Sequence, residues 1–522
     1  MKRTLMTRAR RAAMVVSVTG LVAVTAAGVA GAGAGGGTWS SAGGNRTNTR
    51  YQETEHKISV DSVGDLGVDW VLETGGDVSA TPAVDDQNVY VPDWAGNLYA
   101  ADRSTGAVVW QESIASYTGI PGDKARATPA IDGDILVIGN QGPFGGGGAV
   151  MGINKHTGEL LWKTQVETHP AAIITQSATV FDGVVFVGVA SQEEALAAVV
   201  PGYPCCTFRG SMAALDVQTG ALLWKTYLAP EGYSGNAVWG SSPAVDVKRG
   251  SVYIATGNNY SVPASVLDCV TAAGDDPDAK AACLPADNHF DSIMSLNMKT
   301  GAINWATRAL PYDAWTVDCI PFFGDGDNCP EPAGPDYDFG QAPALFTVRP
   351  SSKGKPSELV GAGQKSGQYW ALNPDTGAVV WVTQAGPGGT AGGLQWGSAV
   401  DGQRVYTANA NSNTNEGIWS AIDAATGELL WQTMPSNGNS TSGPATVANG
   451  VMFGCALDAD GHMYALDAAT GEELWSFASG GSCLSGAAIS NGSVYWGSGY
   501  SNFFGAFGAG TPNNKLYAFS LD

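Results

Sequence analysis

The chain has 522 residues, of which 71 are glycine, 16 are tryptophan and only 14% are charged. This length exceeds what one hydrophobic core supports, and the composition favours many short strands and tight turns over long helices. The formal net charge of −22 excludes a basic nucleic-acid-binding face, because phosphate binding needs clustered lysine and arginine side chains.

The first 34 residues have the pattern of an export signal. They contain five basic side chains and no acidic one, an apolar run from Ala12 to Ala30, and the small residues Ala32-Gly33-Ala34. This order is typical of a secretory signal peptide, and the alternative is an uncleaved membrane anchor. We therefore expect a secreted, extracytoplasmic protein whose mature chain has no membrane span, with residues 35–64 as an N-terminal extension.

A motif, Thr-Gly-x-x-x-Trp, recurs through the rest of the chain. In each copy an alternating apolar segment ends at Asp or Asn, a Thr-Gly turn follows, and a second strand closes on Trp, as in "LDVQTGALLW". The pattern predicts a hairpin whose glycine supplies a positive φ angle. The seven copies end at Trp110, Trp162, Trp224, Trp305, Trp381, Trp431 and Trp475.

An eighth copy is split between the two ends of the chain. "LGVDWVLETGG" near residue 70 supplies the Trp strand, and "NNKLYAFSLD" at the C-terminus supplies the strand that elsewhere precedes Thr-Gly. The repeat spacing ranges from 40 residues (Trp70 to Trp110) to 81 (Trp224 to Trp305), which fits four-stranded blades with insertions. We predict an all-β fold over residues 65–522, an eight-bladed β-propeller closed by N- and C-terminal strands, with each Trp packed between adjacent blades.

Eight cysteines in an exported chain indicate disulfide bonds rather than a metal site. Neither C-x-x-C nor C-x-x-C-H occurs, which argues against thiolate ligands and against covalently attached haem c on this chain. Any electrons produced would have to leave to another protein or a diffusible acceptor. The favoured local pairs are Cys205 with Cys206, Cys269 with Cys283, Cys319 with Cys329, and Cys455 with Cys483.

Polar residues break the repeat at strand ends in the middle of the chain. Glu193 and Glu194 are adjacent carboxylates after a predicted strand, and Asn258 ends the stretch "SVYIATGNN", one strand after Trp239. Taken singly, each fits a solvated loop. Taken together, they predict oxygen ligands for a hard divalent cation beside a flat aromatic surface.

Two further boundaries carry charged residues. Asp336 and Asp338 precede the strand "APALF", and residues spaced i, i+2 on extended chain point the same way. Lys365 lies between two predicted strands, a position with few other basic residues. We therefore expect these side chains to face the central channel, although solvated loops remain the alternative.

These residues together resemble the quinoprotein alcohol dehydrogenases, which use pyrroloquinoline quinone (PQQ) and a metal ion at the axis of an eight-bladed propeller. The resemblance is carried by the repeats, by the vicinal Cys205-Cys206, and by "WGSSPAVD" followed by "TGN". The stretches "YPCCTFRGS", "DAWTVDC" and "PDYDFG" are most similar to the polyvinyl-alcohol dehydrogenase branch.

The resemblance implies a set of metal ligands and a general base. Glu193 would bind the cation with Asn258, with Glu194 as the fallback, and Asp336 would lie beside the ion. The expected ion is Ca²⁺, with a lanthanide as the alternative because lanthanide-using relatives share the D-x-D spacing. Asp336 is preferred over Asp338 as the base, although alignment by distance to Lys365 favours Asp338.

The resemblance also implies a binding site for the quinone. Arg126 and Thr175 would hold its polar groups, and Trp239 would lie beneath its ring. Lys365 would face the quinone oxygens. The displaced Cys205-Cys206 pair would either cap the opposite face of the quinone or only stiffen its own loop.

The implied activity is oxidation of secondary alcohols to ketones, with a polymer such as polyvinyl alcohol as one candidate substrate. The acceptor would be an external cytochrome c or another electron carrier. The rival hypothesis is a PQQ-free propeller that acts as a binding or assembly scaffold. A hydrolase lacks support, because no Ser/His/Asp arrangement is evident and only five histidines exist.

Overall fold

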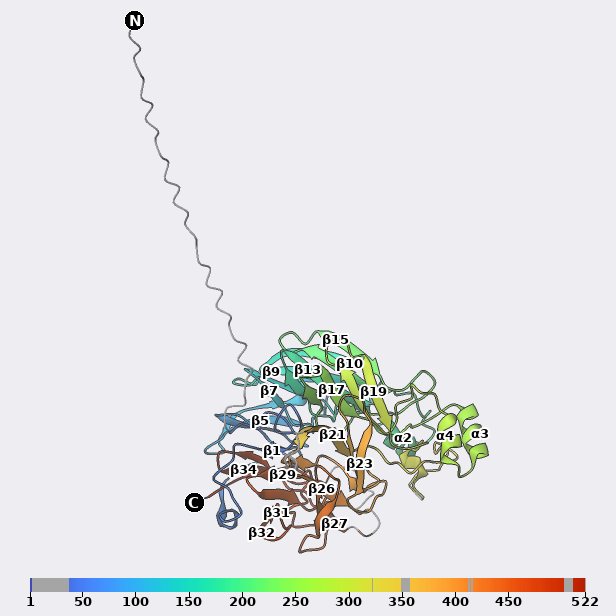
Figure 1. Ribbon diagram of the computed structural model, residues 1–522. Coiled ribbons are helices and arrows are strands. Elements are labelled where there is room, and N and C mark those ends of the chain that lie inside the picture. Colours follow the sequence, from blue (N-terminus) through green and yellow to red (C-terminus); the bar gives the residue numbers. More distant parts are fainter. Residues whose placement is uncertain are drawn as a thin grey trace. The chain divides into compact units, whose positions relative to one another are not determined.

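Eight sheets, each built on four antiparallel strands and three of them extended by a fifth, are arranged as the blades of a β-propeller (Figure 1). The computed structural model describes residue 1 and residues 37–321, 323–348, 357–411, 414, 416–501 and 510–521. The predicted signal peptide, apart from Met1, lies outside these residues. The expected all-β propeller of eight blades is confirmed.

The blades follow the chain in order, each running from its innermost to its outermost strand. The first blade consists of β3 (Ala83–Val84), β4 (Asn88–Pro92), β5 (Asn97–Asp102) and β6 (Val108–Ser113), and the second of β7 (Ala130–Asp132), β8 (Ile135–Gly139), β9 (Gly148–Asn154) and β10 (Leu160–Glu167). The third consists of β12 (Thr179–Phe181), β13 (Val184–Ser191), β14 (Ser211–Asp216) and β15 (Leu222–Tyr227), with β11 (Ala172–Ile173) added to β13. The fourth consists of β16 (Ala244–Asp246), β17 (Ser251–Ala255), β18 (Ser292–Asn297) and β19 (Ile303–Arg308).

The next three blades consist of β20 (Ala344–Val348), β21 (Ser357–Gly363), β22 (Gln368–Leu372) and β23 (Val379–Gln384); β25 (Ala399–Val400), β26 (Arg404–Ala410), β27 (Gly417–Asp423) and β28 (Leu429–Thr433), with β24 (Gly393–Leu394) added to β26; and β29 (Thr446–Ala448), β30 (Val451–Cys455), β31 (His462–Asp467) and β32 (Glu473–Ala478).

The eighth blade joins the two ends of the propeller. It consists of β33 (Ala488–Ser490), β34 (Ser493–Ser498), β35 (Lys515–Leu521) and β2 (Leu66–Glu73). The outer pair is antiparallel, with Val68 opposite Phe519 and Leu72 opposite Leu516. The predicted closure by both terminal strands is therefore confirmed, and it leaves no broken blade in the ring.

The repeated tryptophans pack between blades, as predicted. The Trp110 indole donates a hydrogen bond to the carbonyl of Lys155 in the next blade at 2.8 Å, and Trp475 closes the series with Leu66 at 3.1 Å. The glycine of each Thr-Gly turn lies against the indole ring of the tryptophan from the preceding blade. At Gly106, for example, φ is 70°, and an added Cβ would lie 2.6 Å from Cε3 of Trp70.

Residues 39–52 run along the innermost strands of the blades. Trp39 bridges to Val84, and β1 (Tyr51–Gln52) pairs in parallel with β29. The short 3-10 helix η1 (Val63–Asp65) then leads into β2.

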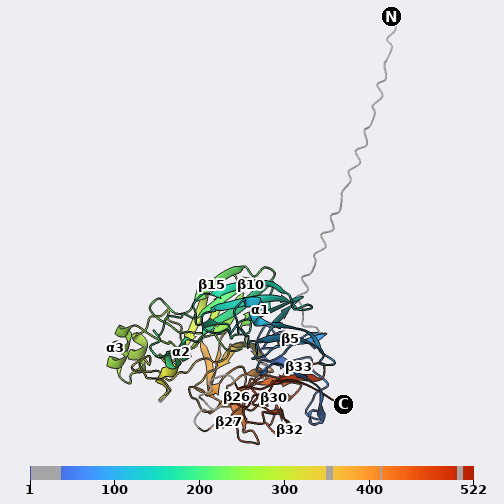
Figure 2. The ribbon, with the colours of Figure 1, turned by 180° about the vertical axis from the view of Figure 1, so that it is seen from behind.

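Helices are confined to a few connections. They are α1 (Ile114–Thr118), α2 (Glu193–Val199), α3 (Ala264–Ala273), α4 (Pro277–Ala282) and the 3-10 helix η2 (Val317–Cys319). In the two opposite views α2 and α3 lie on one side of the propeller (Figures 1 and 2). No helix in the described residues is both long and apolar enough to cross a membrane.

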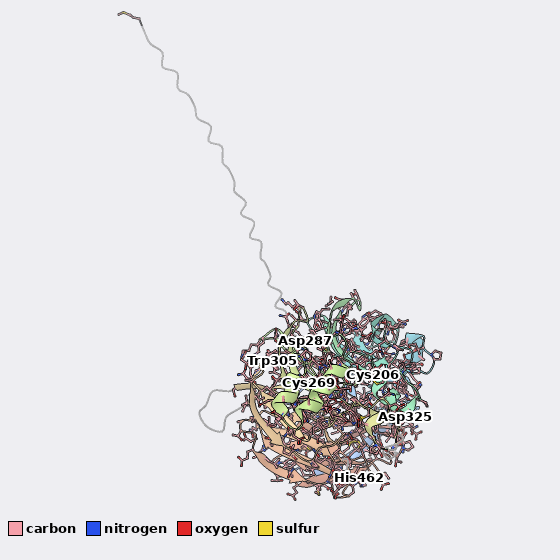
Figure 3. The ribbon with its side chains drawn as sticks, turned by 90° about the vertical axis from the view of Figure 1, so that its right-hand side faces the viewer. Cys206, Cys269, Asp287, Trp305, Asp325 and His462 are labelled. Atoms are coloured by element: carbon pink, nitrogen blue, oxygen red, sulfur yellow. A yellow bond between two sulfur atoms is a disulfide. The ribbon has the colours of Figure 1, made fainter. Side chains whose placement is uncertain are left out.

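All four predicted disulfides are present: Cys205–Cys206, Cys269–Cys283, Cys319–Cys329 and Cys455–Cys483. Figure 3 turns the helical side toward the viewer and labels Cys206 and Cys269 there. The Cys269–Cys283 bond joins α3 to the end of α4, so this helical insertion between β17 and β18 is cross-linked within itself.

Candidate functional site

Lys365 and the two aspartates of the D-x-D motif form the centre of the candidate site. Lys365 follows β21 and the aspartates precede β20, and because these strands are antiparallel neighbours, both positions meet at one end of the blade. The Nζ atom of Lys365 lies 2.8 Å from Oδ1 of Asp336 and 3.1 Å from Oδ2 of Asp338. All three side chains are buried. The structure thus brings together a trio that the sequence places at two separate strand boundaries.

Asp338 links this trio to the preceding blade. Its Oδ1 accepts the backbone N–H of Asn258 at 2.7 Å, and its Oδ2 accepts the indole N–H of Trp239 at 3.0 Å. Gly257 allows the approach, because an added Cβ there would lie 2.6 Å from Oδ1 of Asp338. The Nδ2 group of Asn258 donates to the carbonyl of Trp315 at 2.9 Å, which orients the amide and leaves its oxygen for a ligand.

The two adjacent glutamates of α2 have different surroundings. Glu193 is 1% exposed, and its carboxylate accepts the backbone N–H groups of Thr207 at 2.9 Å and Phe208 at 2.7 Å and the hydroxyl of Tyr203 at 3.2 Å. Glu193 was the preferred ligand from sequence, but its oxygens are committed to the loop after the vicinal disulfide. Glu194 is partly exposed, yet its Oε1 is buried without a hydrogen-bond partner among the described residues. The geometry therefore favours Glu194 over Glu193 for a cation.

Two buried aspartates that no sequence motif singles out lie beside this centre. Asp313, between β19 and β20, accepts the backbone N–H groups of Asp336 at 3.1 Å and Tyr337 at 2.7 Å. These bonds support Asp336 in a left-handed conformation, with φ of 58°. Asp291 immediately precedes β18 and is 0% exposed, and burial and the neighbouring Asp313 carboxyl raise its pKa well above the usual value. In the sequence Asp291 has the same signal as the other acids, because it directly precedes a strand, whereas Asp313 lies within the connection between β19 and β20 and has no such signal.

The carboxylates outnumber the cations, and this shifts their protonation. Burial raises the pKa of Asp336 well above its usual value, with Lys365 opposing the shift and Asp338 adding to it. Burial also raises the pKa of Glu194 to about 8 and that of Asp313 to about 6. Burial alone would lower the pKa of Lys365, but the surrounding carboxylates outweigh it and raise the pKa. An added cation would relieve this excess of negative charge.

Two of the other predicted residues line a cavity whose wall contacts Trp239. Thr175 and Arg126 both line it, and the Thr175 hydroxyl donates to the carbonyl of Trp239 at 3.0 Å. The guanidinium of Arg126 lies 4.3 Å from the ring centroid of Trp396, which itself meets the Trp239 ring edge-on at 5.1 Å. On the side of the acidic trio, the Nζ atom of Lys365 lies 5.6 Å from the ring centroid of Trp239. Trp239 thus contacts the acidic centre through Asp338 and the wall of the Arg126 cavity through Thr175 and Trp396.

The vicinal disulfide lies close to the same region. Cys206 and Trp239 are partly buried and pack against one hydrophobic cluster, and the carbonyl of Cys206 accepts the hydroxyl of Ser261 at 3.2 Å. The next two residues, Thr207 and Phe208, are bound by Glu193 as described above. The loop is thus fixed beside the site, while contact of Cys205 and Cys206 with a cofactor remains a prediction.

A metal ion here would need amide oxygens and atoms of a bound molecule as ligands in addition to carboxylates. No group of three or more His, Cys, Asp or Glu side chains in the described part of the chain has the geometry to hold a metal alone. The available donors are the buried Glu194 oxygen, the Asn258 amide oxygen and the Asp336 carboxylate. Calcium takes six to eight oxygen ligands, so a bound molecule would have to supply the rest.

Comparison with known proteins places the chain in a family. The family model described as "Outer membrane protein assembly factor BamB" matches residues 32–307 and 365–522. The chain belongs to this family. The resemblance noted from the sequence motifs is also confirmed, because the chain is similar to the polyvinylalcohol dehydrogenases of Sphingopyxis sp. (strain 113P3) and Pseudomonas sp..

The two relatives share 29% and 27% identity with this chain. Each alignment covers 93% of this chain, and it covers 76% and 77% of the respective relative. A solved structure, the quinohemoprotein alcohol dehydrogenase ADHIIG from Pseudomonas putida HK5, matches with a TM-score of 0.70 and 19% identity, covering 93% of this chain and 80% of that one. At this identity the structural match supports the fold alone.

Proposed function

We propose that this protein is a PQQ-dependent alcohol dehydrogenase that oxidises secondary hydroxyl groups to ketones. The observation that carries the proposal is the network in which Lys365, Asp336, Asp338 and Asn258 meet at Trp239, with distances of 2.7 to 3.1 Å between partners. A buried excess of acids beside an ammonium group and an aromatic surface is costly for a scaffold to maintain. The polyvinylalcohol dehydrogenase relatives support the same activity.

The residues present fit both a quinone and a cation. Trp239 would lie beneath the quinone ring, with Arg126 and Thr175 toward one end and Lys365 toward the other. Glu194, Asn258 and Asp336 would hold the cation, and the unpartnered Oε1 of Glu194 is the atom that most needs one. When bound, the metal-associated quinone supplies the two-electron oxidant.

Asp336 is better suited than Asp338 to act as the general base. Both oxygens of Asp338 accept N–H groups, from Asn258 and Trp239, so this carboxylate is fixed as a positioning group. The Asp336 carboxylate accepts a hydrogen bond from Lys365 at Oδ1. Asp336 would accept the hydroxyl proton of the alcohol at its other oxygen, and Lys365 would stabilise negative charge that develops nearby.

Substrate, ion, acceptor and location form the finer part of the proposal. The polyvinylalcohol dehydrogenase names of the relatives support secondary hydroxyls, including those of a polymer. The D-x-D pair leaves Ca²⁺ and a lanthanide as the two candidate ions. An external cytochrome c or another carrier would accept the electrons outside the cytoplasm, since the N-terminal sequence has the pattern of an export signal.

Reconstitution with PQQ tests the proposal. Purified protein with PQQ and Ca²⁺, or with La³⁺, should reduce an artificial dye when given a secondary alcohol. Asp336→Asn should lower kcat at least about a hundredfold, because a positioned general base contributes 10²- to 10⁴-fold. The matched control Asp460→Asn, at an exposed aspartate, should retain wild-type rates.

The scaffold hypothesis has its own supporting observation, the match to a family model described as an outer membrane protein assembly factor. It predicts that folded protein binds no PQQ and reduces no dye with either ion. That result would overturn the dehydrogenase proposal in favour of a binding or assembly role.

A further inference from the structure

The N-terminal segment, residues 39–52, follows the innermost strands around the propeller axis. Its backbone carbonyls accept N–H groups from successive blades, and its side chains contact the blades between. The contacts to the eight innermost strands are Trp39 with Val84, Ser40 with Ile131, Arg46 with Phe181, Arg46 with Val245, Thr47 with Leu345, Thr49 with Val400, Arg50 with Val447, and Gln52 with Ile489. The segment therefore belongs to the centre of the propeller rather than to its surface.

Two residues of this segment adopt unusual backbone conformations. Asn48 and Arg50 are left-handed, with φ of 56° and 49°. Neither is glycine, so each conformation costs free energy that the surrounding structure must offset. Such outliers are frequent where a side chain has to be held in a specific place, as at functional sites.

Arg50 is a buried cation without an acidic partner among the described residues. It is 1% exposed, and its Nε, Nη1 and Nη2 donate to the carbonyl of Ala445 at 2.9 Å, the carbonyl of Ala42 at 2.6 Å and the hydroxyl of Thr81 at 2.9 Å. All three acceptors are neutral. A guanidinium has five N–H donors, so donors remain for an anion.

Room for this guanidinium is provided by glycine. An added Cβ at Gly486 would lie 2.2 Å from Nη2 of Arg50. A fully buried and unpaired charge is expensive, and burial alone lowers the pKa of Arg50 to about 9. The fold nevertheless preserves both the charge and the space around it.

Arg50 lines the same cavity as Arg126. None of the residues that line this cavity is acidic. Its other polar lining residues carry hydroxyl groups and include Thr81, Thr128, Thr175, Ser177 and Ser241. Apart from Ala42 and Arg50 of the N-terminal segment, the lining residues precede the innermost strands of seven blades, which places the cavity on the axis. Two guanidinium groups with several hydroxyls form a site for an anion with more than one carboxylate.

We propose that Arg50, delivered by the N-terminal segment, binds a carboxylate of the quinone cofactor together with Arg126. This inference rests on the proposed function, since PQQ supplies the carboxylates. Trp239 contacts both Asp338 of the acidic centre and Trp396 of the cavity wall, so a ligand with carboxylates at one end and quinone oxygens at the other would match a site with guanidinium groups at one end and Lys365 at the other. The N-terminal segment is then part of the cofactor site and not only a closure of the ring.

Equilibrium dialysis of PQQ in the presence of Ca²⁺, followed by absorbance, tests this assignment without any turnover. Arg50→Gln should raise the Kd for PQQ at least about tenfold, since hydrogen bonds between charged groups are the stronger class. The control Arg46→Gln removes an exposed guanidinium from the same segment and should leave the Kd within about twofold of wild type. PQQ trimethyl ester should bind wild type weakly and be insensitive to Arg50→Gln.

The outcomes separate this inference from the proposed function. Wild type that binds no PQQ would overturn the function itself and this inference with it. Wild type that binds, with a folded Arg50→Gln of unchanged Kd, would overturn only the role of Arg50. If Arg50→Gln does not fold, Gly486→Ala decides, because its Cβ would displace the guanidinium without removing it: a tenfold weaker Kd supports the proposal, and an unchanged Kd overturns it.

Discussion

The adjacent glutamates of α2 differ in what their carboxylates contact, and substitution should separate them. Glu194→Gln removes the charge from the proposed ligand and should weaken Ca²⁺ binding at least about tenfold in calorimetric titration. Glu193→Gln should instead lower the free energy of unfolding by about 1–3 kcal/mol, because an amide N–H₂ would face the N–H donors of Thr207 or Phe208. The reverse assignment of these two effects would restore Glu193 as the ligand.

The same residues predict how the metal-free protein responds to pH. Glu194 ionises near 4.5 when unfolded, whereas burial raises its folded pKa to about 8. Between these values the folded state binds more protons, so stability should fall as pH rises from about 4.5 to about 8. Thermal unfolding measured across this range should show the slope. Saturating Ca²⁺ and the Glu194→Gln variant should each flatten it, and an unchanged slope in both would contradict the assignment.

At the scale of single elements, the Thr-Gly turn and its tryptophan act as one contact between blades. Gly106→Ala would place a methyl group 2.6 Å from the Trp70 ring at a φ of 70°. Gly250→Ala is the matched control, because φ is 62° there and nothing lies within 4 Å of the added Cβ. Both variants bear the backbone cost of about 1 kcal/mol, and Gly106→Ala should lose about 1–3 kcal/mol more in chemical denaturation. Equal losses would show that the ring contact contributes little.

At the scale of the whole molecule, stability depends on closing the ring. Removal of residues 515–522 deletes β35, which exposes the edges of β34 and β2 and splits the eighth blade. We expect this truncated chain to lose its single cooperative unfolding transition and to bind hydrophobic dyes. A chain that lacks only residue 522 is the control. A cooperative transition in the longer deletion would show that closure by β35 is dispensable.

Much of the architecture followed from local chemistry. Each Thr-Gly-x-x-x-Trp copy, from Trp110 to Trp475, contains a turn and an interblade contact within six residues. The number of copies therefore predicts the number of blades, and the split eighth copy predicts closure by the two terminal strands. The four disulfides were also evident, because each pairs cysteines that are near in sequence. Asp336, Asp338 and Lys365 were found for the same reason, since each lies at a strand boundary that the repeat makes visible.

The tertiary structure decided what no local pattern contains. Glu193 and Glu194 are neighbours in sequence, and only the position of the Thr207 and Phe208 N–H groups shows which carboxylate is occupied. Asp291 and Asp313 join the cluster because separate strands of neighbouring blades converge there. Arg50 reaches the axial cavity through contacts with residues hundreds of positions away, such as Ala445. The sequence by itself determined the repeat and its closure, because those depend on short-range contacts, whereas the assembly of the site depends on long-range packing that only the folded propeller supplies.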